Sequence, residues 1–255
     1  NRMTLIFAAL LAAAGQAEAK SALPYPKTSL IHCAVADTVD SLTCRAVEAN
    51  KRGRFDEGAN LFEQLAGKLA PADPARARAH AAAGNLWLAA GQHAKAATAL
   101  DKALTGNLLQ AEQQGLALLD RARVAEAQGD LKTARAKVTE AAKTISQDPY
   151  LWYFSAALSL REENIPAAKS AINRALAMAP DSAEVLFEAG HIAQAAGETA
   201  QARDYWTKAI AAEPSGPTGK AAREALAMTD APLTVTNQVA TRPDGDGEGG
   251  TPKGN

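Results

Sequence analysis

The two cysteines, Cys33 and Cys44, are the side chains best suited to covalent chemistry in this chain. Their spacing is not the Cys-x-x-Cys spacing of redox-active pairs. In an oxidising compartment the default expectation is a structural disulfide. It would close a loop of about ten residues and stabilise the fold by roughly 2–3 kcal/mol. Free thiols and a redox-active pair are the alternatives.

Side chains that could bind metal or catalyse a reaction are few and scattered. The four histidines are His32, His80, His93 and His191, and none has a second histidine one helical turn away. Residues 244–249 resemble the first half of a calcium loop, but the position of its bidentate Glu is not a Glu. No G-x-S-x-G or P-loop string occurs. We therefore expect no metal, no cofactor and no enzymatic activity.

The first residues have the pattern of a secretory signal. Arg2 precedes the uncharged apolar run Leu5–Ala14, which is followed by the small-x-small sequence Ala17-Glu18-Ala19. We expect residues 1–19 to be a signal peptide cleaved after Ala19, and the mature protein to be periplasmic or secreted. A retained anchor or an ordinary buried helix is the alternative. Once the signal is removed, no remaining run is long enough for a stable membrane span.

Composition predicts a helical protein. Alanine is the commonest of the 255 residues, while aromatic residues make up only 5%. Because alanine favours helices and disfavours strands, an all-β fold is excluded. A net charge of −1 and a pI of about 6.5 argue against nucleic-acid binding.

An internal repeat is the strongest signal in the sequence. One copy contains Trp152, Ser155-Ala156, Ser159, Ala168, Ile172, Ala175 and Pro180, and its second copy contains Leu186, Ala189-Gly190, Ala193, Ala202, Trp206, Ala209 and Pro214. The landmarks are offset by about 34 residues, the period of the tetratricopeptide repeat (TPR), which this pattern resembles. The resemblance implies helix pairs that stack because neither helix can bury its apolar face alone.

Weaker copies precede these two. The turns within successive pairs are expected at Gly53, Gly91, Gly129, Glu163 and Gly197, with longer connections at 69–74 and 105–110. The fold class is therefore all-α: an α-solenoid of about five TPR-like repeats with a C-terminal capping helix. We expect an extended segment at 20–36, the solenoid at 37–228 and a disordered acidic, Gly-rich tail at 229–255.

The resemblance further implies a concave groove lined by the first helix of each pair. Mapping the sequence onto that face picks out Asn85, Leu88, Leu119, Asp120, Arg123, Tyr150, Tyr153, Phe154, Glu184, Phe187, Glu188 and His191. Of these, the residues expected to contact a partner are Asn85, Leu119, Arg123, Tyr150, Tyr153, Phe154, Phe187 and His191. The four tyrosines and phenylalanines of this set could be exposed or buried, whereas Trp152 and Trp206 are expected to fill packing positions. The Lys, Arg and Asn clamp of carboxylate-tail binders is largely missing, because Ala81, Asp120, Tyr150 and Phe154 take its places and only Asn85 matches.

Together these features favour an exported, non-catalytic scaffold that binds a protein or peptide partner in the cell envelope, as a monomer or weak homo-oligomer. The alternative is an accessory subunit of an envelope enzyme or cytochrome-maturation complex, in which the cysteines or histidines have a redox or metal role.

Overall fold

The computed structural model describes residues 33–230 of the chain. Within this range the secondary structure is helical: α2 (Val39–Lys51), α3 (Phe55–Lys68), α4 (Pro74–Ala89), α5 (His93–Leu104), the short η2 (Thr105–Asn107), α6 (Ala111–Ala127), α7 (Leu131–Ala141), α8 (Pro149–Arg161), α9 (Ile165–Met178), α10 (Ala183–Ala195), α11 (Thr199–Ala212) and α12 (Pro217–Asp230). The predicted signal peptide, nearly all of the predicted extended segment and the tail beyond Asp230 lie outside the described residues.

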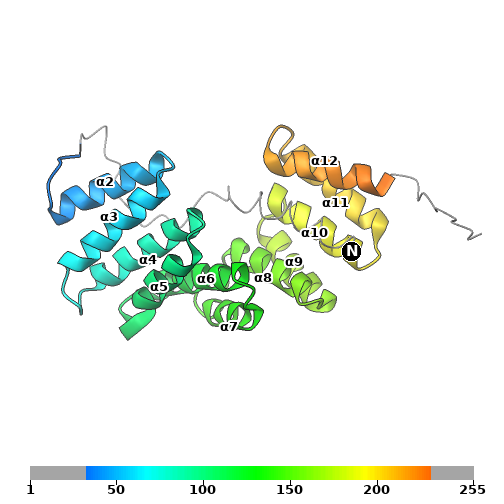
Figure 1. The fold of residues 1–255 in the computed structure, drawn as a ribbon. Coiled ribbons are helices and arrows are strands. Elements are labelled where there is room, and N and C mark those ends of the chain that lie inside the picture. Colours follow the sequence, from blue (N-terminus) through cyan, green and yellow to red (C-terminus); the bar gives the residue numbers. More distant parts are fainter. Residues whose placement is uncertain (1–32, 231–255) are drawn as a thin grey trace, which may run out of the picture.

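The helices form five antiparallel pairs and one closing helix. The pairs α2–α3, α4–α5, α6–α7, α8–α9 and α10–α11 follow one another along an arc, from α2 at one end to α12 at the other (Figure 1). The last helix packs against α11 and α10, where it covers the apolar face that a further repeat would otherwise bury. The predicted all-α solenoid of five repeats with a capping helix is confirmed.

All five turns within the pairs occur at the predicted residues. Gly53, Gly91, Gly129 and Gly197 have φ between 69° and 81°, in the left-handed region that glycine enters without steric cost. Glu163 stands at the corresponding position with φ 57°. The turn geometry therefore persists in the one repeat where the glycine is replaced.

The small-residue positions of the repeat are buried between packed helices. The alanines at these positions have no exposed surface: Ala96, Ala103, Ala134, Ala141, Ala168, Ala175, Ala202 and Ala209. A larger side chain at any of them would force the packed helices apart. The high alanine content thus reflects close helix packing as well as helix propensity.

The two tryptophans expected to fill packing positions behave differently. Trp206 is 2% exposed and its indole Nε1 donates to the carbonyl oxygen of Phe187 at 3.2 Å. Trp152 is only half-buried; its Nε1 donates to the carbonyl oxygen of Ser146, and the guanidinium of Arg174 lies 4.3 Å from its ring. The expectation holds for Trp206 and only partly for Trp152.

Side-chain caps set several helix starts where the sequence predicts them. Asp73 and Asp148 each precede a proline at the first helical position, and each carboxylate accepts a backbone N–H of the first turn at 2.8 Å. Ser182 caps α10 through the N–H of Val185. These caps fix the starts of α4, α8 and α10, three helices that carry the site described below.

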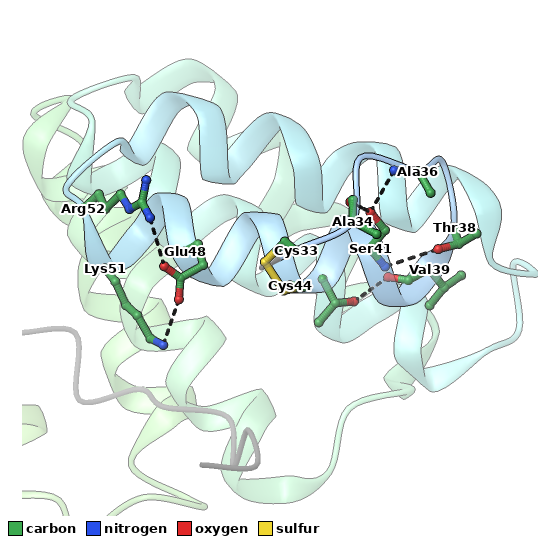
Figure 2. Close-up of a disulfide and its surroundings, with 11 residues drawn as sticks. Cys33, Ala34, Ala36, Thr38, Val39, Ser41, Cys44, Glu48, Lys51 and Arg52 are labelled. Atoms are coloured by element: carbon green, nitrogen blue, oxygen red, sulfur yellow. Dashed lines mark hydrogen bonds and ion pairs between the residues drawn. A yellow bond between two sulfur atoms is a disulfide. The ribbon is translucent and has the colours of Figure 1, made fainter. Parts of the chain in front are cut away.

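The structure contains the predicted disulfide between Cys33 and Cys44, with Cα atoms 5.6 Å apart. It ties the segment before α2 to the middle of that helix (Figure 2). The same segment is held by Ser41, whose hydroxyl donates to the carbonyl oxygen of Ala34 and accepts the N–H of Ala36. The disulfide therefore secures the first helix of the solenoid.

The longer connections also occur where they are expected. Residues 69–73 join α3 to α4, and η2 lies between α5 and α6 with Gly106 at φ 80° and Asn107 at φ 53°. At the other end α12 continues through Thr229 and Asp230, slightly beyond the boundary predicted for the solenoid.

Candidate functional site

A row of interacting side chains runs along the first helices of four successive pairs. It consists of Asn85 on α4, Asp120 and Arg123 on α6, Tyr150 and Tyr153 on α8, and Glu188 and His191 on α10. We call this set the polar row. Its members come from four helices because equivalent positions of stacked repeats fall side by side along a solenoid.

In the first half of the polar row, hydrogen bonds join Asn85, Asp120 and Arg123. Asp120 is 8% exposed; its Oδ2 accepts from the side-chain amide of Asn85 at 2.8 Å, and its Oδ1 accepts from Arg123 at 3.1 Å. The Arg123 guanidinium lies 5.6 Å from the ring centroid of Tyr150, within range of a cation–π interaction. Both oxygens of the buried carboxylate are thereby partnered, one from α4 and one from α6, and Arg123 connects the pair to α8.

In the second half of the polar row, some polar atoms lack a hydrogen-bond partner among the described residues. The rings of Tyr150 and Tyr153 lie 5.6 Å apart, and Tyr153 is next to α10. On α10, Glu188 is 1% exposed and its Oε2 lies 3.8 Å from Nδ1 of His191, too far for a hydrogen bond. Neither Glu188 Oε1 nor His191 Nδ1 has a hydrogen-bond partner among the described residues. Buried polar atoms without partners are uncommon in native proteins and call for a specific explanation.

Burial changes the acidity of both tyrosines. Desolvation raises the pKa of Tyr150, against the opposing charge of Arg123. Desolvation also raises the pKa of Tyr153 far above its usual value, and the negative charge of Glu188 adds to this effect. Both phenols therefore stay neutral at physiological pH, as hydrogen-bonding groups on partly covered rings.

The structure divides the eight residues expected to contact a partner into two groups. Asn85, Arg123, Tyr150, Tyr153 and His191 are partly exposed and belong to the polar row. Leu119, Phe154 and Phe187 are buried, with 2%, 8% and 6% of their surface exposed, and they pack in hydrophobic clusters. These three side chains therefore belong to the packed interior and not to an exposed contact surface.

The fold itself is shared with known helical-repeat structures. PilW, described as a widely conserved type IV pilus biogenesis factor, superposes with a TM-score of 0.63 at 18% identity over 74% of this chain and 83% of its own. PilF of Pseudomonas aeruginosa gives a TM-score of 0.61 at 13% identity, covering 75% of this chain and 82% of that one. YrrB, described as a TPR protein with an unusual peptide-binding site, gives 0.54 at 15% identity, covering 74% and 93%.

The chain has the tetratricopeptide-repeat fold. No protein-family model matches it, and no curated protein matches it in sequence. At these identities the structural likeness concerns the fold alone. The polar row lies on the first helices of TPR repeats two to five.

Sequence mapping places Asp120 and Glu188 on the concave face. They were not among the eight residues expected to contact a partner, because a lone carboxylate gives little signal in a sequence. The available signal is their repetition. Arg123 follows Asp120 by three residues, His191 follows Glu188 by three residues, and the two pairs stand two TPR repeats apart. Only the structure shows that Arg123 reaches the carboxylate of Asp120 while His191 does not reach that of Glu188.

Surface hollows lie elsewhere on the TPR solenoid. One of about 370 Å³ is lined by residues of α3, α4 and α5, including Trp87 and Lys95, whose ammonium is 4.2 Å from the Trp87 ring centroid. Another of about 500 Å³ lies between α11 and the start of α10. Neither is lined by a residue of the polar row.

The described part of the TPR solenoid offers little for metal or membrane chemistry. Between residues 33 and 230, no three His, Cys, Asp or Glu side chains come together in a way that could hold a metal ion. Over the same range no helix is long and apolar enough to cross a bilayer. Cys33 and Cys44 are consumed by their disulfide.

Proposed function

We propose that this protein is an exported, non-catalytic TPR scaffold that binds a segment of a partner protein along its polar row. The observation that carries the proposal is the continuity of the row across four repeats. A partner lying along it would meet amide, carboxylate, guanidinium and phenol groups in succession. Rigid, partly buried Tyr and Arg side chains are the types that dominate binding energy at interfaces.

The structural neighbours support protein binding as the class of function. One is described as a pilus biogenesis factor and another as having a peptide-binding site. A TPR solenoid is a rigid platform whose function resides in the side chains of its faces.

Two features support a location in the cell envelope. The start of the sequence has the signal-peptide pattern at residues 1–19. The disulfide between Cys33 and Cys44 is a cross-link that persists in oxidising compartments such as the periplasm. We propose periplasmic or secreted placement on these grounds.

The test is recovery of a partner from the native envelope by wild-type protein and by two variants. Tyr153→Ala removes the ring that joins the two halves of the polar row, whereas Asn173→Ala changes an exposed residue of α9 outside the row. We expect Tyr153→Ala to weaken recovery about tenfold or more and Asn173→Ala to leave it unchanged. Both variants must retain wild-type helicity by circular dichroism. Equal recovery by all three proteins would refute the proposed site.

A further inference from the structure

The disulfide lies on the same face of the solenoid as the polar row. Cys44 stands nine residues before the turn of its helix pair, as Asp120 and Glu188 do in theirs. Residues at the same distance from the turn occupy equivalent positions of their repeats. Cys44 therefore holds on α2 the position that the two carboxylates of the polar row hold on α6 and α10.

The cross-link fixes the point at which the preceding chain joins the solenoid. Cys33 is bonded to Cys44 in the middle of α2, and the chain then runs back to the start of that helix, where Ser41 holds it (Figure 2). The residues before Cys33 are thereby tethered to the face of the polar row, and not to the outer end of the solenoid.

The composition of the tethered segment suits an extended ligand. Residues 20–32, which follow the predicted signal peptide, contain two lysines and no Asp or Glu. Pro24 and Pro26 oppose a helix and favour an extended backbone. An extended segment can contact several stacked repeats in turn, because it advances from one first helix to the next.

The length of the segment matches the length of the row. Residues 20–32 span about 40 Å in the extended form. Packed helices lie about 8–10 Å apart, so the four steps from α2 to α10 cover about the same distance. Residues next to the tether would therefore meet α4, and Lys20 would reach α10.

The near end of the row is apolar, as is the near end of the segment. Ala82 stands on α4 at the position that Cys44 holds on α2, and both Ala81 and Ala82 are partly exposed above the first hydrophobic cluster. The segment carries Leu30 and Ile31 beside the tether. Contact between these side chains removes apolar surface from water on both sides.

The far end of the row is acidic, and the far end of the segment is basic. Glu184 is exposed and stands thirteen residues before its turn, as Tyr150 does on α8. Helix α10 contains two glutamates and no Lys or Arg. After cleavage of the signal peptide, the segment would begin with the α-amine and the side chain of Lys20, two positive groups that complement this end.

We propose that residues 20–32 lie along the polar row and occupy it until a partner displaces them. This inference rests on the proposed function, because the segment and the partner compete for the same face. A tethered segment acts at an effective concentration in the millimolar range, so a partner must bind more tightly than the segment does. The N-terminal segment would thus set the affinity threshold for the partner.

The first test is photocrosslinking within the full chain that begins at Lys20, with a photoreactive amino acid in place of Tyr25. An extended chain places position 25 about 25 Å from Cys33, over α6 or α8. We expect mass spectrometry to find crosslinks to residues 111–161 of the same molecule, with mixed isotope-labelled and unlabelled chains excluding links between molecules. The same group in place of the exposed Ala227 of α12 should give none to this range. Absence of the position-25 crosslinks would overturn the proposal.

The second test measures competition by fluorescence anisotropy with a labelled synthetic peptide of residues 20–32. The peptide should bind a chain that starts at Cys33 at least tenfold more tightly than the chain that starts at Lys20, whose own segment occupies the row. A peptide of the same composition in shuffled order should not bind. Circular dichroism must show equal helicity for the two proteins. Equal affinity for both chains, or no binding to the shorter one, would overturn the proposal.

A matched pair of charge reversals tests the far end of the row in the chain that starts at Cys33. Glu184→Lys should weaken the peptide about fivefold, because it replaces attraction to Lys20 with repulsion. Glu224→Lys makes the same change at an exposed position of α12 and should alter affinity by less than about twofold. Equal effects of the two variants would contradict the proposed placement of the segment.

The outcomes separate this inference from the proposed function. If recovery of the envelope partner depends on Tyr153 but is unchanged by removal of residues 20–32, and their peptide does not bind, the inference fails and the binding face stands. If the peptide binds along the row while no partner depends on Tyr153, the row holds only its own segment and the proposed function fails.

Discussion

Gly190 in α10 is the position where a single added methyl group tests the packing of the repeats. A Cβ atom at this residue would lie 2.2 Å from Nε1 and 2.4 Å from Cδ1 of Trp206. Trp206 is 2% exposed and its indole donates to the carbonyl oxygen of Phe187, so the ring has no free space to move into. Gly190→Ala must therefore push α10 and α11 apart or displace the indole.

The change in the free energy of unfolding has three contributions, two that lower it and one that raises it. Overpacking a well-filled contact costs about 1–3 kcal/mol. Breaking the indole hydrogen bond costs about 1 kcal/mol more. Alanine improves helix propensity over glycine by about 1 kcal/mol. The net expectation is that Gly190→Ala lowers the free energy of unfolding by about 1–3 kcal/mol.

The same substitution elsewhere serves as the control. Gly67 lies in α3, and a methyl group added there would have no neighbouring atom within 4 Å, so Gly67→Ala should gain about 0.5–1 kcal/mol from helix propensity alone. Thermal and urea unfolding followed by circular dichroism measure both variants. A domain of this size shifts its Tm by about 2–4 °C per kcal/mol. If Gly190→Ala were as stable as Gly67→Ala, the close contact between α10 and Trp206 would be refuted.

Three further predictions concern other parts of the solenoid. Glu163→Gly should raise the free energy of unfolding by about 0.5–1 kcal/mol in urea titrations, because glycine adopts the φ of 57° without strain; a loss of stability would contradict the turn geometry. The double variant Cys33→Ser, Cys44→Ser should lower Tm through a loss of about 2–3 kcal/mol, and an unchanged Tm would show that the cross-link does not secure α2. The imidazole of His80 lowers the pKa of the Glu63 carboxyl, against the effect of burial. Because the pKa of Glu63 in the folded state lies below the ordinary value of 4.5, the ionised carboxylate stabilises the fold above pH 4.5. This stabilisation is lost as the pH falls through the lower pKa. Glu63→Gln should therefore flatten that part of the stability–pH curve, and an unaltered curve would disprove the coupling.

The architecture was predictable because the repeat constrains it at many positions at once. Turn residues such as Gly91 and Gly197 require a left-handed conformation, and alanines such as Ala168 and Ala202 stand where two helix backbones approach closely. Each of these requirements restricts residue type, so it leaves a mark in the sequence. Even Glu163, which breaks the glycine pattern, keeps the turn because the flanking helices impose it.

Side-chain exposure on the binding face was less predictable. A helical period places Phe154 and Phe187 near the face, but it does not separate a ring that points outward from one rotated toward the next helix. Both rings turn inward and join hydrophobic clusters with Leu119 and Leu186, respectively. Conversely, Trp152 occupies the repeat's large position yet remains half-buried, with the Arg174 guanidinium 4.3 Å from its ring centroid.

The difference between the two carboxylates of the polar row could not be derived from sequence alone. Glu188 and His191 are separated by a gap of 3.8 Å where Asp120 and Arg123 make contact. That difference depends on side-chain length and on the rings that pack against His191. Neither the distance nor the unpartnered atoms can be inferred from residue spacing.

The most direct test of the central claim is photocrosslinking in the native cell envelope, with a photoreactive amino acid in place of Tyr153 and, separately, in place of the exposed Asn173 of α9. The polar row as a binding face predicts a discrete crosslinked partner from position 153, identified by mass spectrometry, and none of that partner from position 173. Equal crosslinking from both positions, or crosslinking from position 173 alone, would contradict it.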